Sequence, residues 1–112
     1  MKKLFLTVLV IVSACSATNE VPDDLIPQEE MIQIMTEIHI LEAKIKNLNI
    51  QTIDSATQVY QHYEQLLFSD FGITSEQYEQ SFNYYVDNMG EFKKIYDAVV
   101  DTLMQREKLQ SN

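Results

Sequence analysis

Helical periodicity is the feature that most constrains the fold of this chain of 112 residues. Apolar side chains recur every three or four residues in four successive stretches between Pro27 and Leu103, the spacing of one face of an α-helix. No stretch of the sequence alternates apolar and polar residues as a half-buried strand does. Short connections between the stretches favour antiparallel neighbours. The sequence therefore predicts an all-α fold, a compact bundle of about four helices.

Start and stop signals separate the four predicted helices. The first helix is expected to begin at Pro27, and its core stripe is Met31, Ile34, Met35, Ile38, Leu41, Ile45 and Leu48. Gly72 is expected to end the second helix in a left-handed conformation. Three capping boxes indicate the starts of the remaining helices: Ser55 with Gln58, Thr74 with Gln77, and Asn88 with Glu91.

A different signal lies at the N-terminus. Cys15 is the only cysteine, and it follows a basic start and a short apolar run that ends in Val12-Ser13-Ala14. These are the marks of a secretory signal, and the run is shorter than the roughly 20 apolar residues that span a membrane. Val-Ser-Ala-Cys is similar to the lipobox of bacterial lipoproteins. We predict cleavage between Ala14 and Cys15 and acylation of Cys15 with lipid chains such as palmitate. The alternative is an unmodified cysteine, after an ordinary signal peptide or buried as a free thiol.

The anchor divides the chain into three segments. Residues 1–14 are the predicted signal peptide, residues 15–24 the acylated cysteine with a flexible polar tether, and residues 25–109 a single helical domain. Fully extended, the tether spans roughly 30 Å, so the domain can stand clear of the lipid headgroups. With Cys15 acylated, no thiol remains for a disulfide or a cysteine metal site. Stability must therefore come from packing.

The charge of the chain restricts its partners. The formal net charge is −9 at pH 7, and cleavage before Cys15 would also remove Lys2 and Lys3. Such a charge repels phosphate backbones, which proteins usually bind by neutralising the phosphates with Lys and Arg. It repels anionic lipid surfaces as well. We therefore expect no nucleic-acid partner, and attachment to the membrane only through the lipid anchor on Cys15.

Two parts of the sequence resemble a known family. One runs from Val21 to Met31 and on through Ile38-His39-Ile40-Leu41-Glu42-Ala43. The other runs from Asp70 to Ser81 and is followed by Tyr84, Tyr85 and Ile95-Tyr96-Asp97. Over roughly residues 21 to 103 their order and spacing are similar to those of the DUF4296 family, small lipoproteins of the Bacteroidota. The resemblance implies an envelope lipoprotein with a compact helical domain, and it implies no activity.

The resemblance also bears on localisation. In this bacterial group, acidic residues close behind the acylated cysteine are associated with display on the cell surface. Here residues 16–19 are uncharged, and the first acid is Glu20. We therefore expect a lipid-anchored protein of the outer membrane that faces the periplasm, with display on the cell surface as the alternative.

The sequence offers no clear site for chemistry. His39 and His62 are the only histidines, and we expect His39 to pair with Glu42 rather than to bind a metal. The only two glycines, Gly72 and Gly90, cannot build a glycine-rich phosphate loop. We therefore predict no enzymatic activity, no metal site and no cofactor.

Several apolar side chains lie outside the predicted core stripes. Ile40 lies nearly opposite the stripe of the first helix, and Ile32 lies on an intermediate strip. Phe68 and Tyr84 are off the stripes of their own helices. These four residues are the candidate partner-binding residues, because exposed apolar patches mark interaction sites. The alternative is a wrapped bundle that buries the first helix on two sides.

Three functional hypotheses follow. The first is an accessory subunit of an envelope assembly, transport or secretion complex, whose helical domain binds another envelope protein. The second is a periplasmic ligand-binding module in which an apolar pocket between helices is lined by Tyr60, Tyr63, Tyr78 and Tyr85. The third is an acidic inhibitor of a cationic envelope hydrolase such as a lysozyme. Each hypothesis requires a different surface, so the arrangement of the helices bears on all three.

Overall fold

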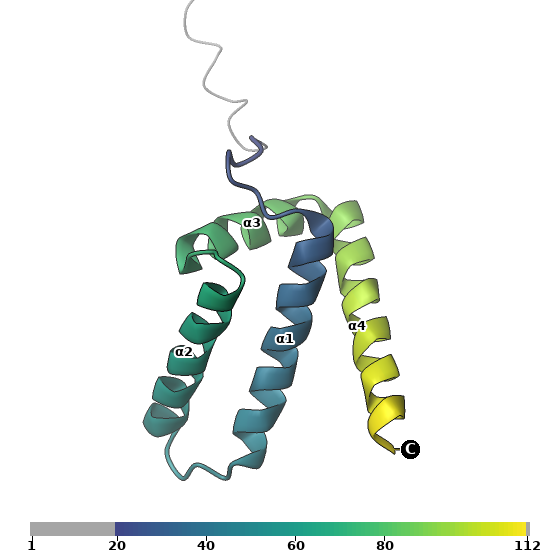
Figure 1. Cartoon of the computed structure of the whole chain (residues 1–112). Helices are drawn as coiled ribbons and strands as arrows, with labels where there is room; N and C mark the ends of the chain where they lie inside the picture. The colour runs from purple at the N-terminus through teal and green to yellow at the C-terminus, as the bar shows by residue number, and fades with distance from the viewer. Residues whose placement is uncertain (1–19, 112) are drawn as a thin grey trace, which may run out of the picture.

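The computed structural model describes residues 20–111, which form four α-helices joined by short turns (Figure 1). The helices are α1 (Gln28–Asn47), α2 (Ile53–Asp70), α3 (Ser75–Asp87) and α4 (Met89–Ser111). α1 lies between α2 and α4, and α3 crosses one end of this layer (Figure 1). The predicted all-α bundle of four helices is confirmed. The predicted signal peptide, the cleavage site and Cys15 lie outside the described residues.

The directions of the helices follow from the crossing by α3. α2 runs antiparallel to α1, as a short connection predicts, whereas α4 starts beside the beginning of α1 and runs parallel to it (Figure 1). Gln28 Nε2 donates a hydrogen bond to Glu91 Oε2 and so joins the first turns of α1 and α4. The opposite end of the molecule holds the α1–α2 turn and the C-terminus of α4, and α3 does not cover it (Figure 1).

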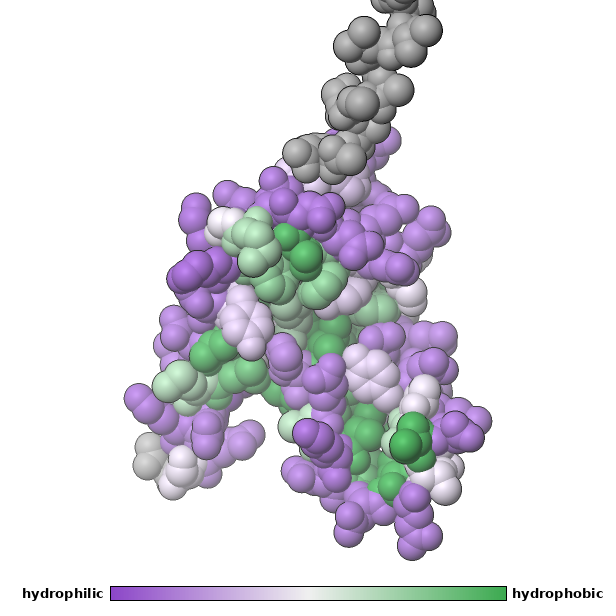
Figure 2. Space-filling view, turned by 180° about the vertical axis from the view of Figure 1, so that it is seen from behind, coloured by the Kyte–Doolittle hydropathy of each residue, from purple (hydrophilic) through white to green (hydrophobic). Residues whose placement is uncertain are grey.

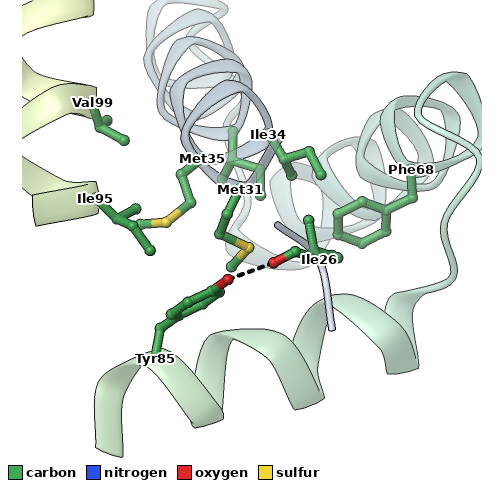
Figure 3. Close-up of a cluster of buried hydrophobic side chains, with 9 residues drawn as sticks. Ile26, Met31, Ile34, Met35, Phe68, Tyr85, Ile95 and Val99 are labelled. Atoms are coloured by element: carbon green, nitrogen blue, oxygen red, sulfur yellow. Dashed lines mark hydrogen bonds between the residues drawn. The ribbon is translucent and has the colours of Figure 1, made fainter. Parts of the chain in front are cut away.

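The core lies where α1 meets the other three helices (Figure 3). Met35 reaches toward Ile95 of α4, whereas Ile34 lies on the side of Phe68 of α2 (Figure 3). The core stripe predicted for the first helix is confirmed in its first half, where Met31, Ile34, Met35 and Ile38 are buried. In its second half Leu41 and Ile45 are only partly buried, and Leu48 is exposed. α3 crosses only the end at which α1 begins, so it does not cover the second half of this stripe (Figure 1).

α1 is also buried away from this stripe. Thr36 is among the most buried residues of the protein, and its hydroxyl donates to the carbonyl of Ile32 at 2.7 Å. Ile32 is itself partly buried against the core. The hydroxyl is satisfied within its own helix, so a polar side chain is tolerated at a buried position. The structure therefore favours the alternative in which the first helix is covered on two sides.

The turn between α2 and α3 is fixed by the backbone. Gly72 has φ of 69°, and its N–H donates to the carbonyl of Ser69 at 3.0 Å. The N–H of Ile73 donates to the carbonyl of Phe68, also at 3.0 Å. These two bonds form a Schellman motif, which requires a left-handed residue at the position of Gly72. The predicted end of the second helix is confirmed.

The helix starts agree only partly with the predicted capping boxes. Thr74 caps α3 as predicted, since its Oγ1 accepts from the backbone N–H of Gln77 at 3.0 Å. α2 begins earlier than predicted, because Thr52 is its N-cap and accepts from the N–H of Ser55 at 3.1 Å. α1 begins at Gln28 with Pro27 as its N-cap, one residue from the predicted position.

Asn88, the predicted N-cap of the last helix, bonds with its side chain to α3 instead. Its Nδ2 donates to the carbonyl of Tyr84 at 2.7 Å, so the side chain satisfies the last turn of α3. The first turn of α4 is joined to Asn88 through the backbone, where the N–H of Glu91 donates to the Asn88 carbonyl at 2.9 Å. The prediction that the Asn88 side chain caps the last helix is therefore wrong, because that side chain is bound one turn back.

Three side chains of α3 fix the segment that precedes α1. Gln77 Nε2 donates to the carbonyl of Asp24 at 2.8 Å, and Ser81 Oγ accepts from the N–H of Ile26 at 3.0 Å. Tyr85 Oη donates to the carbonyl of Ile26 at 2.6 Å (Figure 3). The three residues lie four apart, which places them on one face of the helix. The predicted tether of residues 15–24 therefore ends in a residue that is bound to α3.

Candidate interaction surface

The four predicted partner-binding residues do not form one surface. Phe68 is only 3% exposed and stacks near Tyr78, with ring centroids 5.1 Å apart. Its prediction as a surface residue is wrong, because the chain turns sharply after α2 and brings Tyr78 of α3 against this ring. Ile32 and Tyr84 are partly buried against the core. Ile40 is the one of the four that lines an open groove.

This groove, the α1–α2 groove, has a volume of about 650 Å³. Its apolar lining consists of Ile40, Leu41, Ile45, Leu48, Tyr63, Leu66 and Leu67. Tyr63 and Leu66 are each 49% exposed, and Leu48 is 60% exposed. Polar side chains complete the lining: Glu37, Lys44, Asn47 and Asp70. An apolar centre with polar surroundings is the usual arrangement of a protein-binding surface.

The far end of the α1–α2 pair is apolar on its other face as well. Figure 2 shows a hydrophobic strip along this part of the molecule, with hydrophilic surface on both sides. A hollow on the same helix pair is lined by Ala43, Ile45, Ile50, Ile53 and Ala56 among others. Ile53 is 85% exposed at the start of α2. The end of the molecule that α3 leaves uncovered therefore carries the exposed apolar residues of both faces.

All four helices contribute to a second cavity, the aromatic pocket, with a volume of about 360 Å³. Its lining is Met35, Ile38, His39, Glu42, Tyr60, Glu64, Tyr78, Phe82, Phe92 and Tyr96. The rings form a row, with centroids 6.0 Å apart for Tyr78 and Phe82, 5.7 Å for Phe82 and Phe92, and 6.2 Å for Phe92 and Tyr96. Such distances are usual for aromatic pairs.

The pocket of four tyrosines predicted from the sequence is not formed. Tyr60 and Tyr78 line the aromatic pocket, whereas Tyr63 lies in the α1–α2 groove. Tyr85 is buried in the core, where its hydroxyl is bound to Ile26. The prediction was wrong for these two residues because their helices present them to different neighbours.

Burial and negative charge dominate the electrostatics of the aromatic pocket. Burial, followed by the negative charges of Glu64 and Glu42, raises the pKa of Tyr78 to about 12. Burial also raises the pKa of Tyr60, followed by its hydrogen bond to Glu64 and the charge of that residue. Both shifts favour the neutral phenol, since a phenolate there would be poorly solvated and would face carboxylates.

The two histidines lie on different helices, His39 on α1 and His62 on α2. His39 Nδ1 is 3.7 Å from Glu42 Oε2, the predicted pairing within α1. His62 is exposed, and its ring and that of Tyr63 form an edge-to-face pair with centroids 5.4 Å apart. Within residues 20–111, no three His, Cys, Asp or Glu side chains are grouped so that they could hold a metal ion.

None of the helices described here is both long and apolar enough to cross a membrane.

Comparison with known proteins identifies the family. Residues 22–109 match the model of the family described as Domain of unknown function (DUF4296). The match begins just before the segment that is fixed to α3 and covers all four helices as far as residue 109 in α4. No curated protein and no solved structure matches the chain. Because the family model covers most of its length, the chain belongs to the DUF4296 family.

Proposed function

We propose that the protein is a lipid-anchored lipoprotein of the outer membrane whose helical domain binds another envelope protein through the α1–α2 groove. The observation that carries this proposal is the exposed apolar lining of that groove. Leu48, Tyr63 and Leu66 are about half exposed or more, although they neighbour one another across two helices. Monomeric proteins rarely leave contiguous apolar patches larger than a few hundred Å² open to water, and such patches mark interaction sites.

The shape of the groove favours a helix as its occupant. Leu41, Ile45 and the C-cap residue Leu48 follow one another at helical spacing along α1 and its end. Tyr63, Leu66 and Leu67 do so along α2. Two antiparallel helices with apolar residues on their facing edges form a trough for a third helix. An amphipathic helix binds such a trough with apolar residues at every third or fourth position. We therefore expect the partner to present an amphipathic helix.

The fixed segment before α1 supports an orientation for this interaction. Residues 20–27 reach α1 from the end that α3 crosses, and the α1–α2 turn lies at the opposite end (Figure 1). The predicted lipid at Cys15 precedes Asp24 by nine residues, which span roughly 30 Å at most. The anchor would thus hold the α3 end toward the outer membrane and direct the exposed end of the groove into the periplasm. An accessory subunit of an envelope assembly, transport or secretion complex fits this geometry.

The experiment is purification of the lipoprotein from gently solubilised membranes. The wild-type protein should retain a stoichiometric envelope protein. Leu66→Asp should lose it, because the loss of one buried apolar anchor costs about 2 kcal/mol of binding or more. The matched control is Leu109→Asp, at a leucine of α4 that is 77% exposed, and it should retain the partner. Equal thermal unfolding curves of the two variants would show that Leu66→Asp acts on binding.

Two results would contradict the proposal. Retention of the partner by Leu66→Asp would exclude the α1–α2 groove as its binding site, and a cationic hydrolase as the retained protein would favour the inhibitor hypothesis instead. The anchor has its own test in Cys15→Ser. This variant should be unacylated and should appear in the soluble or unprocessed fraction, so equal membrane attachment of wild type and variant would refute the lipid anchor.

A further inference from the structure

We infer that the aromatic pocket binds a small organic cation, an ammonium group that carries a short apolar body. The pocket lies apart from the α1–α2 groove and is built by all four helices. This inference therefore does not depend on the protein partner proposed above. Its basis is the combination of aromatic rings, carboxylates and an apolar wall in one cavity.

The aromatic side chains supply the first part of a cation site. Tyr60, Tyr78, Phe82, Phe92 and Tyr96 line the pocket from three different helices. Aromatic rings have negative faces, and a cation placed over such faces is attracted to them. Several rings around one cavity are the arrangement by which proteins bind quaternary ammonium groups. Tyr96 is 45% exposed, so the row of rings reaches the surface and leaves an entrance.

Carboxylates supply the second part. Glu42 of α1 and Glu64 of α2 line the pocket, and Glu64 is partly buried. No lysine or arginine belongs to the lining formed by the described residues. His39 is the one lining residue that can become positively charged, and its ring lies 3.7 Å from Glu42. The pocket is therefore negative, which disfavours an anionic ligand and favours a cation.

Size and polarity restrict the ligand further. The volume of about 360 Å³ is near the lower end of the range for ligand sites, about 300–1,000 Å³. Met35 and Ile38 add an apolar wall from α1. The negative charges of Glu42 and Glu64 also contribute to the raised pKa of Tyr78, so their potential reaches the rings. A cation of the size of choline, with methyl groups against the rings and its charge beside a carboxylate, meets these conditions.

The test compares two probes of equal shape on the purified mature lipoprotein in a non-ionic detergent. Choline carries a trimethylammonium group, and 3,3-dimethylbutan-1-ol replaces that group with an uncharged tert-butyl group. Isothermal titration calorimetry should show saturable binding of choline and much weaker binding of the alcohol. Glu64→Gln and Tyr96→Leu should each weaken choline binding by roughly fivefold or more, since each removes a charge or a ring that faces the cation.

The matched control is Asp101→Asn, which removes one exposed carboxylate of α4 outside the pocket lining. It lowers the total negative charge as much as Glu64→Gln does and should leave choline binding unchanged. Equal binding of choline and the alcohol would overturn the inference, because the site would then be merely apolar. Equal weakening by Asp101→Asn and Glu64→Gln would overturn it too, as would the absence of saturable choline binding below about 10 mM.

Discussion

The hydroxyl of Tyr85 joins two parts of the chain that are far apart in sequence. It donates a bond of 2.6 Å to the carbonyl of Ile26, and both residues are buried. Tyr85→Phe removes the donor and leaves a buried carbonyl without its partner, which costs about 1–3 kcal/mol. We therefore expect a loss of this size in the free energy of unfolding, measured by urea denaturation. Tyr84→Phe, at the next residue along the chain, is the control and should cost less than about 0.5 kcal/mol. Equal effects of the two variants would mean that the bond to Ile26 does not stabilise the fold.

The raised pKa of Tyr78 predicts that the free energy of unfolding falls at alkaline pH. Burial, followed by the charges of Glu64 and Glu42, raises its pKa from 10.0 to about 12, so between these values the unfolded chain loses the proton and the folded protein keeps it. The stabilisation is complete below pH 10 and is lost as the pH rises toward 12, since the unfolded state then binds fewer protons. Urea denaturation at about pH 9 and about pH 11 should show a larger loss of stability for wild type than for Tyr78→Phe. Identical losses would contradict the raised pKa of this residue.

The burial of a side chain could be predicted from the sequence where the helical period of its own helix decides it. Met31, Ile34, Met35 and Ile38 follow the helical period, and they are buried as predicted. Phe68 lies off the stripe of its helix and is buried nonetheless, because the Schellman turn brings α3 against it. The buried Thr36 was missed for a related reason. Its burial depends on a second neighbouring helix, which the pattern of α1 does not encode.

At the scale of elements, the turn between α2 and α3 sets the direction of the second half of the chain. Gly72 has φ of 69°, and a Cβ at this position would meet no atom within 4 Å. The cost of Gly72→Ala is therefore conformational, about 1–2 kcal/mol for an L-residue in the left-handed region. Gly90→Ala is the control, because Gly90 lies in α4 and its added Cβ also meets nothing. Thermal unfolding should show a lower midpoint for Gly72→Ala and an unchanged or higher midpoint for Gly90→Ala. A lower midpoint for both variants would contradict the conformational explanation.

Helix existence was predictable from the sequence, and helix boundaries were less so. Gly72 was assigned correctly because it is the only glycine near the end of α2, and Thr74 because, unlike Ser75, it has a glutamine three residues on. At the start of α2, Thr52 and Ser55 both suit an N-cap, and the structure uses the earlier one. Asn88 lies between two helices that are one residue apart, so its side chain can satisfy either, and it satisfies α3. Local pattern alone does not decide such competitions.

At the scale of the whole molecule, the arrangement of the helices depends on bonds that no local pattern reveals. Gln77, Ser81 and Tyr85 hold Asp24 and Ile26 across more than fifty positions of the sequence. These bonds fix the end at which the chain enters, while the crossing by α3 leaves the far end of the α1–α2 pair uncovered (Figure 1). The sequence predicted an apolar excess on the helices correctly. It could not place that excess, because the exposure of Ile40, Tyr63 and Leu66 depends on how far a third helix covers the α1–α2 pair.

Site-specific photocrosslinking in intact cells tests whether a partner protein binds in the α1–α2 groove. A photoreactive phenylalanine analogue at Tyr63 lies in the α1–α2 groove, and the same analogue at Asp101 lies on the exposed acidic surface of α4. We expect a covalent adduct with one envelope protein from position 63, and its loss when Leu66→Asp is added. From position 101 we expect no such adduct. An adduct with the same protein from position 101 and none from position 63 would contradict binding in the α1–α2 groove, because the partner would then bind α4.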